Sequence, residues 1–120
     1  MLDWTGRISL VAANPSFTGF WDEEIIGCAG VTPVWHGRAI AWALISIHAG
    51  PARMLAIHRD VGEFLDDVQR RPEFRRIEAT CAREFTAARR WVIMLGFQHE
   101  GLMRRYDAQG VDHDLYARVR

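Results

Sequence analysis

Residues 39–68, with the sequence AIAWALISIHAGPARMLAIHRDVGEFLDDV, decide the fold because the spacing of their apolar residues changes halfway along. Residues 39–46 are apolar on both alternating faces, which is typical of a strand in the middle of a sheet. After Gly50, apolar residues recur at steps of three and four, which places them on one face of a helix that begins at Pro51 or Ala52. A central strand followed by a crossover helix is therefore predicted. The apolar face of this helix comprises Met54, Ile57, Val61, Leu65 and Val68.

The sequence before this stretch predicts two further antiparallel strands. The aromatic, β-prone residues 17–21 run into the acidic residues 22–24, and apolar residues resume at 25–31, which is the pattern of a hairpin. A second turn is predicted at residues 35–38. We therefore expect a single domain with an N-terminal extension at residues 1–16 and a core at residues 17–119.

The sequence after it predicts a strand, a helix and a closing hairpin. Residues 76–81 alternate apolar and polar side chains, and residues 85–95 return to helical spacing before Gly96, where a helix cap is expected. Residues 102–106 and 115–119 flank a turn and form the predicted hairpin. The fold class is therefore α+β, with a mixed, mostly antiparallel central sheet, a crossover helix and a second helix.

The composition excludes several classes of protein. The 120 residues suit one domain, and the 15 basic side chains are all arginines, so neither a lysine Schiff base nor a Walker lysine is possible. A formal net charge of zero argues against a dedicated nucleic-acid binder. No apolar run reaches the roughly 20 residues of a membrane helix, and residues 1–4 lack the basic start and apolar stretch of a secretory signal, so none is expected. We therefore expect no membrane partner. Because Cys28 and Cys81 are far apart and form no CxxC pair, we also expect a reduced, cytoplasmic protein.

The turn between the central strand and the first helix is a candidate phosphate site. Exposed amides at a helix N-terminus attract anions, the small residues Gly50 and Ala52 allow close approach, and Arg53 adds positive charge. Pro51 removes one amide donor, so an ordinary strand-to-helix turn is the alternative interpretation.

Three segments in a consistent order resemble the GNAT superfamily of N-acetyltransferases. They are residues 17–31 (FTGFWDEEIIGCAGV), residues 50–55 (GPARML) and residues 88–97 (ARRWVIMLGF), the last followed by EGLMRRY at 100–106 and the hairpin residues 112–117. The resemblance implies transfer of an acetyl group from acetyl-CoA, as co-substrate, to an unidentified amine. It also implies a phage-encoded or truncated member that lacks the family's usual N-terminal strand and helices. The implied acetyl-CoA-binding residues are Leu44, Ile45, Ser46, Ala49, Gly50, Ala52 and Arg53.

The departures from the family concern proton transfer and phosphate binding. Val92 stands where many members have the tyrosine that protonates the departing thiolate of coenzyme A, and Ile47 stands where the phosphate loop usually begins with glutamine or arginine. Candidate proton carriers are His48, Cys81 and Glu84. Their ordinary interpretations are a solvated turn histidine, a small core thiol and a carboxylate favoured by a helix N-terminus.

A non-catalytic GNAT-like structural or interaction domain, such as a phage virion-associated protein, is the alternative function. Missing N-terminal elements would uncover apolar surface, so a homodimer is expected. Trp21, Trp35 and Trp42 suit either an acceptor cleft or a buried core or interface. His99 and His113 flank the closing hairpin, but no metal site is predicted from them.

Overall fold

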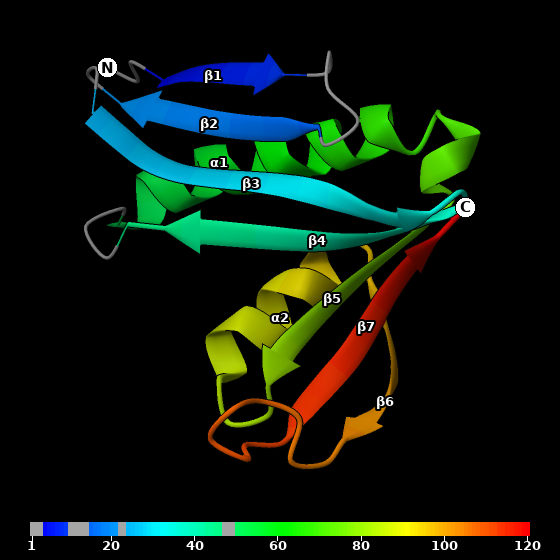
Figure 1. Ribbon diagram of the computed structural model, residues 1–120. Helices are drawn as coiled ribbons and strands as arrows, with labels where there is room; N and C mark the ends of the chain where they lie inside the picture. The colour runs from blue at the N-terminus through cyan, green and yellow to red at the C-terminus, as the bar shows by residue number, and fades with distance from the viewer. Residues whose placement is uncertain (1–3, 10–14, 22–23, 47–49) are drawn as a thin grey trace.

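The computed structural model describes residues 4–9, 15–21, 24–46 and 50–120. In this part of the chain one seven-stranded sheet has the order β1-β2-β3-β4-β5-β7-β6, with two longer helices packed on it (Figure 1). All neighbouring strands are antiparallel except β4 and β5, which the crossover helix α1 connects. The predicted α+β fold class is confirmed. The elements are β1 (Trp4–Ser9), β2 (Ser16–Trp21), β3 (Glu24–Trp35), β4 (Arg38–Ile45), α1 (Gly50–Val68), a 3-10 turn (Pro72–Phe74), β5 (Arg76–Ala82), α2 (Thr86–Met94), β6 (Gln98–Met103) and β7 (His113–Val119).

The opening strand, which was expected to be missing, is present as β1. It pairs with β2 in antiparallel register from Trp4 opposite Trp21 to Ser9 opposite Ser16, and forms one edge of the sheet. Residues 4–9, which were predicted to belong to an extension outside the core, are therefore part of the sheet. No helix lies among the described residues that precede α1.

Strand β4 is the central strand of the sheet, as predicted, but only one of its faces is covered. Ala39 is fully buried, whereas Ile40, Trp42 and Leu44 on the opposite face are 42%, 42% and 68% exposed. Because the side chains of a strand alternate between its two faces, this pattern means that the packed helices lie on the Ala39 face. We call the other face, which no described helix covers, the open face.

The core forms between the sheet and α1. The buried residues of α1 follow the predicted helical spacing and pack with Ile26, Val31, Ala39 and Ile77 of the sheet. Burial of each large apolar side chain contributes about 1.5–3 kcal/mol, so this layer accounts for much of the folding free energy. Neither helix of the described residues is long and apolar enough to cross a membrane. The buried residues of α1 are Ala56, Ile57, Val61, Phe64, Leu65 and Val68.

The closing hairpin is placed differently from the prediction. Its first strand is Gln98–Met103 rather than 102–106, and its second begins at His113 rather than 115. The connecting loop is longer because Arg105 adopts a left-handed φ of 50° and donates its amide to the Asp112 carboxylate at 2.8 Å. The carboxylate of Asp107 accepts hydrogen bonds from the backbone amides of Gln109 and Val111, and these bonds stabilise the turn.

Candidate functional site: a gap between two splayed strands

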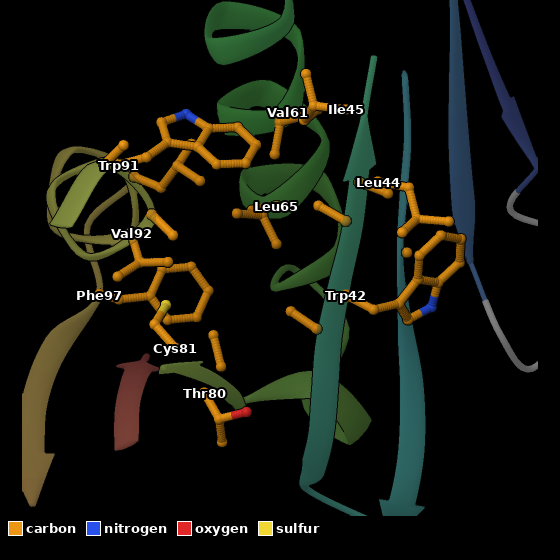
Figure 2. A pocket seen from close by; sticks show the side chains of 18 of the residues that line it. Trp42, Leu44, Ile45, Val61, Leu65, Thr80, Cys81, Trp91, Val92 and Phe97 are labelled. Atoms are coloured by element: carbon orange, nitrogen blue, oxygen red, sulfur yellow. The ribbon is translucent and has the colours of Figure 1, made fainter. Parts of the chain in front are cut away.

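The sheet divides between β4 and β5. The two strands pair only from Arg38 opposite Arg76 to Ile40 opposite Glu78, although β4 continues to Ile45 and β5 to Ala82. Past the paired residues the strands diverge, and a cavity of about 560 Å³ lies in the gap between them, with α1 and α2 on either side (Figure 2). This arrangement is visible in Figure 1 as the separation between the β1–β4 half and the β5–β7–β6 half.

At the closed end of the gap, where β4 and β5 still pair, ion pairs on the open face of the sheet hold the two strands together. Arg38 donates from Nε and Nη2 to the two carboxylate oxygens of Glu78, both at 2.8 Å, and Arg76 Nε donates to Glu78 at 2.7 Å. The hydrogen bonds from Arg38 hold the pKa of Glu78 below its usual value. Arg76 also donates hydrogen bonds to Glu100 on β6, so these ion pairs link β4, β5 and β6 and leave each of the four charges paired.

The open end of the gap exposes backbone groups of β4. The Ser46 amide donates to the Ile26 carbonyl of β3 at 2.7 Å, and Leu44 lies opposite Cys28 in the same register. Because antiparallel hydrogen bonding alternates along a strand, the backbone groups of Leu44 and Ser46 point toward β3. Those of Ala43 and Ile45 point the other way, into the gap, where β5 is no longer paired. Two peptide groups are thus available to an extended ligand that lies along β4.

The walls of the gap are almost entirely apolar. Among the described residues that line it there is no charged side chain, and the polar groups are those of Thr80 and Cys81 and the indoles of Trp42 and Trp91. Trp91 on α2 donates from Nε1 to Nδ1 of His58 on α1 at 3.1 Å, which ties the two helices together. Figure 2 shows Val61 and Leu65 of α1 facing Val92 and Phe97 across the cavity.

The acetyl-CoA-binding residues implied by the resemblance are distributed around one end of the gap. Leu44 and Ile45 line the cavity, whereas Ser46, Gly50, Ala52 and Arg53 are described but do not line it. Gly50 begins α1 with a left-handed φ of 72°, a conformation that favours glycine. Met54, in the next turn of α1, does line the cavity, so the helix N-terminus lies beside its rim. His48 and Ala49 lie outside the described residues.

The other candidate proton carriers differ in placement. Cys81 lines the cavity and is 8% exposed, with burial and then the charge of Asp114 raising the pKa of its thiol. Glu84 is exposed in the turn between β5 and α2 and does not line the cavity. Val92, which the resemblance aligns with the family's tyrosine, also lines the cavity, and its side chain has no proton to donate.

A buried carboxylate beside Cys81 escapes detection in the sequence. Asp114 is 1% exposed, lies opposite Cys81 in the β5–β7 register and binds Nε2 of His99 at 2.8 Å. The His99 hydrogen bond holds the pKa of Asp114 low, with help from Arg83 and Arg89 at 3.7 and 3.6 Å. An acidic residue within a strand predicts a side chain that faces solvent. The burial of Asp114 becomes clear only from the residues that the fold places around it.

The two hairpin histidines serve separate carboxylates. His99 binds Asp114, whereas His113 binds Asp107 at 3.0 Å. No group of three or more potential metal ligands lies together in the described part of the chain.

Asp114→Asn is expected to lower stability at neutral pH by about 1–3 kcal/mol, because a charge-assisted hydrogen bond and two ion pairs lose their buried anion. The folded-state pKa of Asp114 is depressed, so its contribution is present above the unfolded pKa and is lost as pH falls through the folded pKa. Chemical unfolding at pH 7 and at steps down to pH 2 measures both effects. The variant should lose less stability on acidification than the native chain. Asp67→Asn, which removes a surface pair with Arg70, is the control and should change little.

Comparison with known proteins finds relatives by structure only. No protein-family model matches the chain, and no curated protein matches it by sequence. Among solved structures, a spermidine N-acetyltransferase chimera of Vibrio cholerae SpeG and hSSAT matches with a TM-score of 0.75 and 16% identity, over 91% of this chain and 68% of that one. The microcin C7 self-immunity acetyltransferase MccE, solved with acetyl-CoA and AMP, matches with a TM-score of 0.73 and 13% identity, over 89% of this chain and 61% of that one.

A GNAT-family acetyltransferase from Bacillus anthracis matches with a TM-score of 0.73 and 16% identity, over 87% of this chain and 65% of that one. The chain therefore spans about 61 to 68% of the length of these three proteins. The resemblance seen in the sequence is confirmed at the level of architecture: the chain has the fold of the GNAT acetyltransferases.

Proposed function

We propose that this protein transfers an acetyl group from acetyl-CoA to an amine. The observation that carries the proposal is the gap between β4 and β5, which combines apolar walls with the unpaired backbone groups of Ala43 and Ile45. The pantetheine arm of acetyl-CoA is a flexible chain with two amides, so it needs both features. The solved relative MccE, which holds acetyl-CoA, supports the choice of acyl donor.

The N-terminus of α1 is the proposed site for the pyrophosphate. Helix N-termini attract anions through their free amides, and Arg53 adds a guanidinium in the first turn. Because Met54, the residue that follows Arg53 in α1, lines the cavity, a molecule held at this rim can place its thioester end in the gap. The left-handed backbone at Gly50 shapes the approach to the helix.

Within the gap this chain has three tasks in acetyl transfer. The backbone of β4 orients the acyl donor, and the apolar walls exclude water so that the amine, rather than hydroxide, attacks the carbonyl carbon. As the new C–N bond forms and the C–S bond breaks, the thiolate of coenzyme A must gain the proton that the amine loses. We propose Cys81 as the group that delivers it, because its thiol lines the cavity and its raised pKa keeps it protonated at neutral pH.

Titration of the chain with acetyl-CoA in a calorimeter, together with an assay of thiol release in the presence of amines, tests the proposed function. Binding with a dissociation constant between about 1 μM and 1 mM and amine-dependent thiol release are expected. Absence of binding at millimolar acetyl-CoA would refute the proposal and favour the non-catalytic alternative. Binding without release to any amine would leave a coenzyme A-binding module without transferase activity.

A further inference from the structure

The cavity is lined from both faces of the sheet. Side chains alternate along β4, so Ala43 and Ile45 face the helices while Trp42 and Leu44 belong to the open face, yet all four line the cavity. Figure 2 shows Trp42 and Leu44 on the opposite side of β4 from Val61 and Leu65. A donor held on the helix side and an acceptor on the open face would therefore meet in the gap between the strands.

The opening on the open face has an aromatic wall that is fixed in place. Gly30 lies opposite Trp42 in the β3–β4 register, and a Cβ at Gly30 would lie 2.5 Å from Cζ2 of the Trp42 indole. The absence of that Cβ allows the indole to lie directly on the β3 backbone, where it is still 42% exposed. Leu44, 68% exposed, extends the apolar surface along the strand.

This opening offers no carboxylate to a cationic ligand. No aspartate or glutamate is among the described residues that line the cavity. Glu78, at the closed end of the gap, has both oxygens bonded to Arg38 and a further bond from Arg76. A polyamine would leave its additional ammonium groups facing apolar side chains and guanidinium groups, which is costly without counter-charges.

We infer that the acceptor is a primary amine with one apolar, aromatic-sized body, and that this body binds against Trp42 and Leu44 from the open face. The inference rests on the proposed function and names the substrate class of the same site. It excludes polyamines, although one structural relative is a spermidine N-acetyltransferase. The aromatic body supplies dispersion and apolar burial against the indole, and its single amine reaches the thioester through the gap.

Steady-state acetyl transfer with phenethylamine, ethanolamine and spermidine tests this inference. We expect kcat/KM for phenethylamine to exceed that for the other two amines by about tenfold or more, the effect of burying one aromatic ring. Trp42→Ala should lower the phenethylamine value about 5- to 10-fold while the dissociation constant of acetyl-CoA stays the same. Trp35→Ala is the matched control, because Trp35 is an exposed tryptophan that contacts Arg38 and does not line the cavity.

A second variant separates loss of fold from loss of specificity. Leu44→Asp places a carboxylate at the exposed rim and should shift the preference toward spermidine, a gain that an unfolded protein cannot produce. Equal or higher kcat/KM for spermidine in the native chain, with acetyl-CoA binding intact, would overturn the inference and leave the proposed function standing. Failure of the native chain to bind acetyl-CoA would refute both.

Discussion

Ala43→Phe is expected to weaken acetyl-CoA binding by about 10- to 100-fold without unfolding the protein. Ala43 lines the cavity on the helix side of β4, and its side chain is exposed, so the larger ring displaces ligand rather than core residues. Forcing extra volume into a fitted site costs about 1–3 kcal/mol, which corresponds to this range of affinity. Calorimetric titration with acetyl-CoA measures the affinity, and a thermal melt verifies the fold.

The matched control is Ala108→Phe, which adds the same ring at an exposed position of the loop between β6 and β7. It should leave the affinity for acetyl-CoA unchanged. If Ala43→Phe also leaves the affinity unchanged, acetyl-CoA does not lie along β4, and the gap cannot be its site.

The order of the elements from β2 onward follows from the sequence because it depends on periodicity, which is local. The change from strand spacing to helical spacing around Gly50 marks the β4–α1 crossover, and the spacing of Ile57, Val61 and Leu65 defines the buried face of α1. The motif at residues 88–97 supports the same fold independently. These local patterns can be recognised in the sequence without knowing which elements contact each other.

The features that depend on contacts between distant elements do not follow from the periodicity of the sequence. The apolar residues of β4 predict a strand that is covered on both faces, and they do not reveal that no described helix covers the face with Trp42 and Leu44. The splay depends on pairing that stops after Ile40, and no residue type marks this point. Likewise, the burial of Asp114 depends on His99 and two arginines that arrive from other segments.

Cys81→Ser is expected to lower kcat for acetyl transfer by about 10²- to 10⁴-fold, the usual cost of losing a general acid. Serine keeps the approximate shape of Cys81 but its hydroxyl is far less acidic than a thiol, so it cannot deliver a proton to the thiolate of coenzyme A. The affinity for acetyl-CoA should stay within a small factor of the native value. Cys28→Ser, at a half-buried cysteine that does not line the cavity, is the control and should retain the native rate.

The pH dependence distinguishes a proton donor at Cys81 from a merely structural thiol. A general acid must be protonated to act, and burial together with Asp114 raises the pKa of Cys81 above its usual value. The native kcat should therefore hold through neutral pH and fall only when pH rises past that raised pKa, and this alkaline limb should be absent in Cys81→Ser. During each turnover Cys81 gives its proton to the departing thiolate and regains the one lost by the attacking amine, so no acetyl group stays on the sulfur. Native rates in Cys81→Ser would assign proton delivery to water, whereas an acetylated Cys81 seen by mass spectrometry would show that the thiol acts as a nucleophile instead.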